Sequence, residues 1–496
     1  MLAARAPVTM ARARGARASA SPGSSVARRS LASPEHSAIV VTSPKDASAV
    51  ARARVPGRVP GRVSAACSAA SSSAASSSDA RAPLRVLFAA GGTGGHVFPA
   101  IAIADALVAA SDARALPDDR VAEIHFAGTA HRQESRLVPA AGYPLHLVPA
   151  VSLARPIFSP RNLLLPFALA WAAVRAVALL LRLRPHVVVG TGGYVSLPVC
   201  LAAALLRVPL VVQEQNAHPG VANRVLAPAC AAIFVAFAAA ADALGKGRHP
   251  TRQPPKILGN PVRASLRAAV GADARRDARR RARSWFEDAA ETDSETETET
   301  ETYDVASDDA NRVLLVLGGS LGAAAVNRAM ATVAPLALER YPRVWIVWQT
   351  GEREFESVRN AVPRHPRLAV LPFIREMEVA YAAADAAMAR AGAVTCAELL
   401  ATATPAVLVP SPNVAEDHQT ANAREMERAG AATMISEAEL PRGDGDEETI
   451  ERLVRTVWEV VGDDARLRAM ANAAATRDAP DAAEEIAREV ARVARR

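Results

Sequence analysis

The sequence contains little cysteine. Its four cysteines are spread over a chain of 496 residues: Cys67, Cys200, Cys230 and Cys396. None of them has the CxxC spacing or the Cys/His ligand pattern of a metal site, so neither a disulfide framework nor a zinc site is indicated. This cysteine usage fits a reducing compartment.

Acidic residues are almost missing from the first 78 residues, which hold ten Arg and one Lys against only Glu35 and Asp46. The formal net charge of +7 therefore comes from this leader, and the rest of the chain is nearly neutral. A nucleic-acid partner loses its main support. Because residues 1–80 are also rich in Ala, Ser and Arg, we predict a disordered transit peptide, with a chloroplast favoured over a mitochondrion. The alternative is a disordered tail without an address.

A long uninterrupted hydrophobic run is also lacking. The nearest approach is RNLLLPFALAWAAVRAVALLLRLRP at residues 161–185, which Pro166 and Arg175 interrupt. Because the strand-like segment HVVVG follows almost at once, we reject a membrane-spanning helix. Two interpretations remain, a helix packed on a sheet or the same helix resting on a bilayer surface. The second would use flanking arginines, which are Arg155, Arg161, Arg182 and Arg184.

Short β-rich runs alternate with helical patterns in two series, which predicts parallel sheets covered on both faces. Both series open with a strand, a glycine loop and a helix, so we predict an α/β protein with two doubly wound domains. The expected N-terminal domain spans residues 84–265, the C-terminal domain spans 312–475, and a last helix at 476–496 could pack back on the first domain. The segment 266–311 combines a basic block with a Glu/Thr repeat and is interpreted as a solvated insertion.

The stretch GGTGGHVFPA, Gly91 to Ala100, follows an apolar strand and indicates a close approach to the backbone. A strand, a glycine turn and a helix N-terminus aim N–H groups at one spot, which suits a phosphate or pyrophosphate. The loop lacks the Lys-Ser/Thr ending of an ATP-type P-loop, and the third glycine of GxGxxG falls on Val97, which disfavours an NAD enzyme. Similar loops occur in GTGGYVSLP and LGGSLGA. Tight packing turns alone would not explain three such loops.

Several side chains near these loops could carry chemistry. His96 lies where the first loop enters its helix, and an imidazole beside a phosphate can take a hydroxyl proton, so His96 is the candidate base. Thr395 and Glu398 have capping-box spacing, while Glu398 could also accept hydrogen bonds from a ribose diol. Three polar residues of EDHQTANA could contact sugar hydroxyls or only water: His418, Gln419 and Asn422.

Seven motifs together resemble the MurG glycosyltransferases of peptidoglycan synthesis: GGTGGHVFPA, GTGGYVSLP, QEQN, GNPVR, LGGSLGA, RAGAVTCAE and DHQTANA. The resemblance covers nearly everything after Leu84 except the insertion. It implies a GT-B fold, with an acceptor-binding domain and a UDP-sugar-binding domain facing a cleft. It also implies an organelle-targeted enzyme that transfers N-acetylglucosamine from UDP-GlcNAc to the C4 hydroxyl of MurNAc in lipid I, a polyprenyl-diphosphate-linked MurNAc-peptide. The transfer would invert the anomeric centre and give lipid II.

The resemblance also implies roles for single residues, with His96 as the base. The residues implied at the acceptor diphosphate are Gly92, Gly94, Gly95, Gly192, Gly193 and Tyr194. On the donor side, Arg263 and Ser320 would contact the diphosphate, and Ile374 would recognise uracil through its backbone. Glu398 would hold the ribose and Gln419 the sugar. The other implied donor contacts are Thr93, Gly94, Gly95, Asn216, Ala393, Val394, Thr395, Cys396, Ala397 and His418.

The sequence departs from the family pattern at two positions. Gln213 stands where His is usual, and Leu321 replaces a common Gln, which weakens the expectation for donor contacts near Ser320. No metal or other cofactor is expected, because the single DxD, Asp444-Gly-Asp446, lies far past the nucleotide motifs. The leaving UDP would then be stabilised by Arg, N–H groups and helix dipoles. A lipid-borne acceptor favours the helix at 163–183 as a membrane-resting patch, on the stromal side of the inner envelope.

Two alternatives differ in function. A plastid galactolipid synthase would use UDP-galactose and share the C-terminal donor motifs, but it should not need GTGGYVSLP and QEQN. A non-catalytic UDP-sugar or lipid-binding scaffold would not need intact His96, Glu398 and Gln419.

Overall fold

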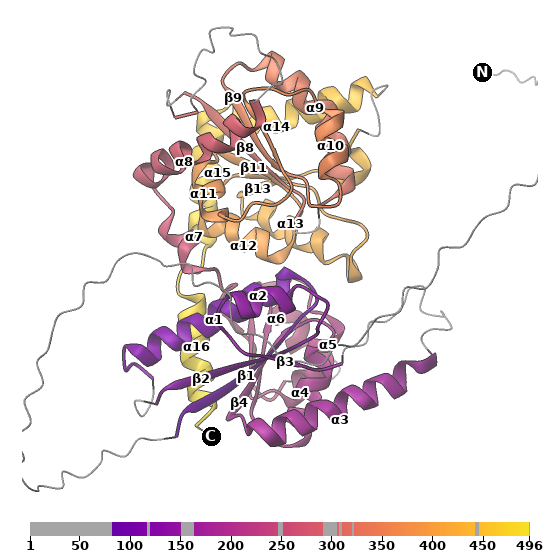
Figure 1. Cartoon of the computed structure of the whole chain (residues 1–496), viewed down its shortest axis with the longest axis vertical. Coiled ribbons are helices and arrows are strands. Elements are labelled where there is room, and N and C mark those ends of the chain that lie inside the picture. The colour runs from indigo at the N-terminus through magenta and orange to yellow at the C-terminus, as the bar shows by residue number, and fades with distance from the viewer. Residues whose placement is uncertain are drawn as a thin grey trace, which may run out of the picture. The chain divides into compact units, whose positions relative to one another are not determined.

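The computed structural model describes residues 82–116, 120–149, 163–246, 251–290, 305–306, 310–319, 322–441 and 446–495. The predicted transit peptide and most of the Glu/Thr repeat lie outside these residues, as do Arg155, Arg161, Ser320 and Leu321. The described part contains two parallel sheets, and we call the parts built on them the N-terminal lobe and the C-terminal lobe (Figure 1). Both lobes belong to one compact unit.

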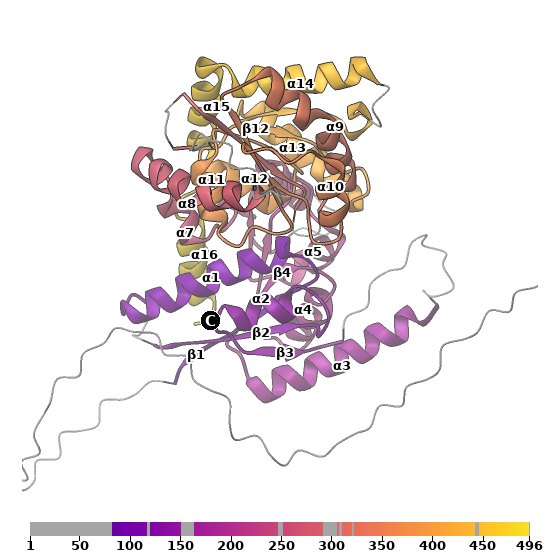
Figure 2. The same ribbon diagram turned by 45° about the horizontal axis from the view of Figure 1, so that its top comes forward.

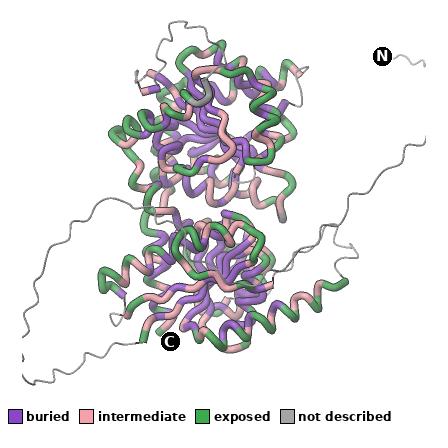
Figure 3. Tube along the Cα trace, viewed as in Figure 1, coloured by how far each residue is buried: buried purple, intermediate pink, exposed green. Residues whose placement is uncertain are grey.

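The N-terminal lobe is built on seven parallel strands in the order β3-β2-β1-β4-β5-β6-β7. The strands are β1 (Leu84–Ala90), β2 (Ala122–Gly128), β3 (Leu145–Leu147), β4 (Val187–Gly192), β5 (Leu210–Glu214), β6 (Ala232–Val235) and β7 (Lys256–Ile257). The helices are α1 (Gly94–Asp112), α2 (Glu134–Ala140), α3 (Leu165–Leu183), α4 (Ser196–Leu205), α5 (Val221–Leu226) and α6 (Ala238–Gly245). Its central strands are continuous apolar runs because both faces of the sheet are buried (Figure 3). Helix α1 begins at Gly94, so the last glycines of the loop and His96 form its first turn.

The C-terminal lobe is built on six parallel strands in the order β10-β9-β8-β11-β12-β13. The strands are β8 (Arg312–Leu317), β9 (Val344–Gln349), β10 (Leu368–Leu371), β11 (Ala386–Ala389), β12 (Ala406–Leu408) and β13 (Ala432–Met434). The helices are α9 (Ala324–Arg340), α10 (Phe355–Ala361), α11 (Met377–Ala383), α12 (Ala393–Ala401), α13 (His418–Arg428), α14 (Glu447–Val461) and α15 (Asp464–Arg477). The prediction of two doubly wound α/β domains is confirmed.

The strand order reverses direction next to the first strand of each sheet. In the N-terminal lobe this point lies between β1 and β4, where Val86 pairs with Val187. In the C-terminal lobe it lies between β8 and β11, where Leu314 pairs with Ala386. Doubly wound sheets bind ligands at the carboxyl ends of the strands at such switch points. The loops GGTGGH and GTGGY therefore meet at one switch point, and the loops GGS and RAG meet at the other.

The last helix of the chain, α16 (Ala482–Val493), packs against α1 of the N-terminal lobe (Figure 1). Its apolar side chains Ile486 and Val490 are fully buried in the same core as Val86 and Phe88 of β1. The first and last described elements, β1 and α16, thus lie in the same lobe, with the C-terminal lobe between them in sequence.

A helix, α8 (Ala272–Ala290), occupies part of the segment that the sequence suggested was a solvated insertion, so that interpretation was wrong for these residues. Its buried side chains Ala278, Ala282 and Phe286 recur every four residues and form one apolar stripe against the C-terminal lobe. Phe286 lies edge-on to Trp345, with ring centroids 4.9 Å apart. The stripe was hidden among six arginines, because most of the helix surface faces water.

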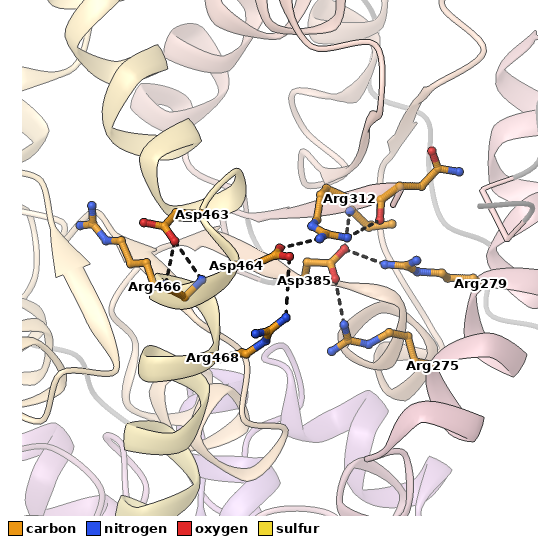
Figure 4. A network of polar contacts seen from close by, with 11 residues as sticks. Arg275, Arg279, Arg312, Asp385, Asp463, Asp464, Arg466 and Arg468 are labelled. Atoms are coloured by element: carbon orange, nitrogen blue, oxygen red, sulfur yellow. Dashed lines mark hydrogen bonds and ion pairs between the residues drawn. The ribbon is translucent and has the colours of Figure 1, made fainter. Parts of the chain in front are cut away.

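Asp385 ties α8 to the start of the sheet (Figure 4). Its carboxylate accepts hydrogen bonds from Arg275 (2.8 Å), from Arg279 (2.7 Å) and from the backbone N–H of Val313 on β8 (2.7 Å). Arg279 and Asp385 are both almost fully buried, so each charge depends on the other for compensation. In the same figure Asp464 pairs with Arg312 at the exposed surface.

Helix α3 is the most exposed apolar helix of the described residues. Two described helices, α1 and α3, are long and apolar enough to cross a membrane by length and composition, with 50% of the apolar window of α1 buried but only 22% of that of α3. Helix α3 packs against α4 (Figure 2). It leads directly into β4, which lies inside the sheet between β1 and β5. One side of α3 is thus held by the lobe while the other faces outward.

We expect Asp385→Asn to lower the free energy of unfolding by on the order of 3 kcal/mol, because it leaves the Arg279 charge buried without a counter-charge. Thermal and urea unfolding of the full chain measure this loss. Asp464→Asn is the matched control, and it should leave the melting temperature almost unchanged because its ion pairs are exposed. Equal melting temperatures for the two variants would contradict this account of α8.

Candidate functional site

The two glycine loops of the N-terminal lobe pack directly against each other. A Cβ atom added to Gly193, whose φ is +86°, would lie 1.9 Å from the carbonyl oxygen of Gly91. A Cβ atom on Gly192, whose φ is +107°, would lie 2.7 Å from Nδ1 of His96. Gly192 and Gly193 are therefore required because a side chain at either position would prevent the two turns from packing together. Gly92, with φ +97° and no atom within 4 Å of an added Cβ, is open on its outer side.

His96 is held by the second turn. Its Nδ1 lies 3.0 Å from the carbonyl oxygen of Thr191 and 3.2 Å from Oε1 of Gln215, and the hydroxyl of Thr191 donates to the carbonyl oxygen of His96. A backbone carbonyl only accepts, so Nδ1 carries the hydrogen and Nε2 keeps its lone pair. Burial lowers the pKa of His96 below its ordinary value of 6.5, partly offset by the negative charge of Glu214. The ring is therefore a neutral base at physiological pH.

Glu214 is a buried carboxylate that the sequence analysis did not select, although it lies within the QEQN motif. It accepts hydrogen bonds from the backbone and side-chain nitrogens of Asn216 (2.9 and 3.1 Å), from Gly220 N–H (2.9 Å) and from Asn223 Nδ2 (2.8 Å). These bonds fix the chain that leaves β5. Glu214 also favours the protonated form of His96, so it connects this turn to the candidate base.

Asn422 of α13 joins the two lobes. Its Oδ1 accepts from Ala217 N–H (2.9 Å), and its Nδ2 donates to Asn216 Oδ1 (3.3 Å) and to Ala391 C=O (3.2 Å). Asn422 is fully buried with its polar atoms engaged, so the interpretation of this residue as a sugar ligand or a solvated side chain was wrong. The side chain of Asn216, predicted to contact the donor, is itself part of this seam.

A second seam contact is made by Asn260 of the GNPVR motif. Its Oδ1 accepts from Gln213 Nε2 (3.0 Å), while its Nδ2 donates to the carbonyl oxygens of Gln215 (3.0 Å) and Ala393 (3.3 Å). Ala393 is the first residue of α12, and α12 also packs against α1. The glycine-loop helices of both lobes therefore meet at this seam.

Glu398 is buried on α12, where Arg263 donates to it at 3.2 Å and the hydroxyl of Tyr381 donates at 3.1 Å. Burial raises the pKa of the Glu398 carboxyl, and the two partners offset part of that rise. The guanidinium of Arg263 also lies 4.8 Å from the ring centroid of Phe98 on α1, and its Nε is buried without a partner among the described residues. Arg263 thus contacts both glycine-loop helices.

The capping-box interpretation of Thr395 and Glu398 was wrong. Helix α12 begins one residue after Gly392, which occupies the N-cap and makes no side-chain cap, and Thr395 lies within the first turn. The Thr395–Glu398 spacing therefore matches a capping box only by coincidence. The N-cap is a glycine, and the carboxylate of Glu398 binds Arg263 instead. The first N–H groups of the helix, at 393–395, have no partner within it, whereas Cys396 is fully buried and its N–H donates to Gly392 C=O.

The further predicted donor residues lie in separate parts of the fold. Ile374 is buried, and its N–H donates to Oε1 of Gln349 (2.8 Å), whose Nε2 donates to Gly319 C=O (3.1 Å). Gln419 accepts from Ser411 N–H (2.8 Å) through Oε1. His418 lies near enough to His96 for its charge to lower the pKa of His96. Thr93 is exposed at the N-cap of α1.

Within the described ranges, no group of three or more His, Cys, Asp or Glu side chains is placed to hold a metal ion. Asp446, the described acid of the DxD, accepts from Thr449 N–H at 3.3 Å and caps α14. Cys200, Cys230 and Cys396 are buried free thiols.

Comparison with known proteins matches both lobes. Models of the glycosyltransferase family 28 N-terminal and C-terminal domains match residues 86–235 and 313–486. The chain is 46% identical over 417 residues to the UDP-N-acetylglucosamine–N-acetylmuramyl-(pentapeptide) pyrophosphoryl-undecaprenol N-acetylglucosamine transferase of Salinibacter ruber, covering 84% of this chain and 98% of that protein. The protein of the same name from Myxococcus xanthus is 35% identical over 82% of this chain and 91% of its own length. The crystal structure of Acinetobacter baumannii MurG is similar with a TM-score of 0.57 and 26% identity, covering 82% of this chain and 99% of that chain.

Proposed function

Since the chain belongs to glycosyltransferase family 28, we propose that it transfers N-acetylglucosamine from UDP-GlcNAc to the MurNAc sugar of lipid I, giving lipid II for peptidoglycan synthesis. The relative that is 46% identical carries this activity in its name, and the match spans 98% of its length. The observation that carries the proposal is the fixed, neutral imidazole of His96 beside paired glycine turns, at a seam with α12.

In the proposed step, Nε2 of His96 takes the proton of the MurNAc C4 hydroxyl while that oxygen attacks the anomeric carbon of GlcNAc. The bond from this carbon to the UDP oxygen breaks, and its electron pair leaves on UDP. Attack opposite the leaving group inverts the anomeric centre. The glycine turns, with Gly94, Gly95, Gly192, Gly193 and Tyr194, would hold the acceptor diphosphate through backbone N–H groups. Gly92 was predicted to do the same, but its N–H donates to Glu134 (2.9 Å), so it would only line the site.

The donor would bind mainly to the C-terminal lobe. Glu398 would release Arg263 and accept hydrogen bonds from the ribose diol instead. The freed guanidinium would then bind the diphosphate together with Ser320 and the first N–H groups of α12. Because the N–H of Ile374 is engaged by Gln349, its carbonyl oxygen would accept from N3–H of uracil. The other proposed donor contacts are Thr93, Gly94, Gly95, Asn216, Ala393, Val394, Thr395, His418 and Gln419.

Helix α3 is proposed to rest on the membrane that carries the acceptor. The large exposed apolar residues of α3 and of the two residues before it are Leu163, Leu164, Phe167, Trp171, Val174 and Leu181, with relative exposures from 57% to 76%. Phe167, Trp171 and Val174 are spaced for one helix face, and Arg175, Arg182 and Arg184 supply positive charge for anionic headgroups. Residues 1–80 are proposed to direct import into a chloroplast, where the enzyme would lie on the stromal face of the inner envelope; imaging of a fusion of these residues to a fluorescent protein tests this address.

Wild-type full-length protein should turn over UDP-GlcNAc with a lipid I analogue, and it should use UDP-GalNAc and UDP-Gal poorly. We expect EDTA to leave the rate unchanged, because Arg263 and helix N-termini are proposed to neutralise the leaving diphosphate. Chromatography of radiolabelled product measures both. Preference for galactose, or loss of activity in EDTA that Mg²⁺ or Mn²⁺ restores, would overturn the proposal.

His96→Gln should reduce kcat/KM by at least about 10²-fold, because it removes the base. In the wild type, kcat/KM should be constant near neutral pH and fall in acid with a midpoint below pH 6.5, since burial lowers the pKa of His96 below its ordinary value and protonation abolishes its lone pair. A pH profile of transfer measures this limb. A fall in wild-type kcat/KM centred above pH 7, or the same acid-side fall in the His96→Gln variant, would assign the base to another group.

Phe167→Ser combined with Trp171→Ser should weaken binding to anionic lipid vesicles by at least tenfold, because it removes two large apolar side chains from α3. Flotation of the full chain with vesicles measures binding. Ile257→Ser is the control, since Ile257 is 55% exposed on β7, close to the 57% of Trp171. Equal binding by both variants would separate α3 from the membrane.

A further inference from the structure

A cavity of about 290 Å³ lies in the N-terminal lobe beside the paired glycine turns. Gly92 and Tyr194 line it from the turns, and Thr129, His131 and Arg132 line it from the loop between β2 and α2. That loop has no part in the function described above. Its side chains face the open outer side of Gly92, where no atom lies within 4 Å of an added Cβ.

Glu134 forms the floor of the cavity and is fully buried. Its carboxylate accepts from Gly92 N–H (2.9 Å), from Thr129 N–H (3.0 Å) and from the Thr129 hydroxyl (2.5 Å). Added Cβ atoms on Gly91 and Gly128 would lie within 2.8 Å of Glu134, so the side chain is packed from both sides. The negative charge is thus satisfied by three donors, and it fixes the glycine turn and the β2–α2 loop at one spacing.

Arg132 stands at the mouth of this fixed cavity. Its carbonyl oxygen accepts from the N–H (3.1 Å) and the hydroxyl (2.7 Å) of Ser135, which holds its backbone in place. Its side chain is exposed. A guanidinium presents a planar fork of donors that matches two phosphate oxygens, and a rigid backbone reduces the entropy lost when it binds.

We propose that Arg132 is a specificity-determining residue that binds the diphosphate of the lipid-linked acceptor from the side opposite the paired glycine turns. This inference rests on the proposed function, and it assigns to the β2–α2 loop the selection of diphosphate-linked acceptors. The cavity, at about 290 Å³, is close to the lower end of the range for small-molecule pockets, which suits a group as small as a diphosphate. Glu134 acts as a positioning residue, because it sets the distance between Gly92 and the loop that carries Arg132.

The experiment compares full-length wild type, Arg132→Gln and Arg132→Lys on two MurNAc-peptide acceptors, one with a short lipid diphosphate and one with an uncharged alkyl glycoside. We expect Arg132→Gln to raise the acceptor KM at least tenfold for the diphosphate and less than twofold for the glycoside, with the KM of UDP-GlcNAc unchanged. Arg132→Lys should fall between, because it keeps the charge without the fork. Lys246→Gln is the control, because Lys246 is an exposed cation of the same lobe, ion-paired with Asp242.

Calorimetric titration with inorganic pyrophosphate, in the presence of saturating UDP, tests the site without turnover. We expect binding by Arg132→Gln to be at least fivefold weaker than by wild type. Equal pyrophosphate affinity, or equal loss of activity on both acceptors, would overturn the inference even if the wild type makes lipid II. If the wild type catalyses no transfer but the variant still binds pyrophosphate more weakly, the proposed function would be overturned. The anion site at Arg132 would still be supported.

Discussion

The site depends on one backbone contact, the approach of Gly193 to the carbonyl oxygen of Gly91. A Cβ atom at position 193 would overlap this oxygen, so only glycine fits there. The contact follows from the sheet order, since β1 and β4 are neighbours and their loops leave the same edge. Because Gly192 also leaves room for the ring of His96, the same packing fixes where the imidazole lies and which nitrogen it presents.

Among the described residues, buried amides and the Arg263–Glu398 ion pair link the two lobes near α12. Asn422 and Asn260 each link a turn of the N-terminal lobe to the region that precedes or starts α12, and Arg263 reaches Glu398 from the connecting segment. Hydrogen bonds of this kind fix the orientation of the joined segments through their directionality, more than through the free energy that each contributes. A nucleotide that competes for Glu398 therefore acts on a contact between lobes as well as on a single side chain.

The sequence predicted the strands, the glycine loops and the family because those signals are local or recur in order along the chain. It did not predict α8, since three apolar residues in an arginine-rich helix resemble a solvated segment until their burial is known. The roles of Asn422 and Glu214 were missed because their partners lie on other elements. Glu134 gave no signal, for its three donors come from two loops that only the sheet brings together.

The placement of α16 affects the order in which the protein is completed. Ile486 and Val490 fill the core between α1 and the first sheet, so the first lobe lacks part of its interior until the final residues have been synthesised. The second lobe has all of its strands earlier. A domain whose core needs a segment distant in sequence exposes apolar surface until that segment is available, and such exposed surface favours aggregation. Helix α16 thus completes the core of the N-terminal lobe.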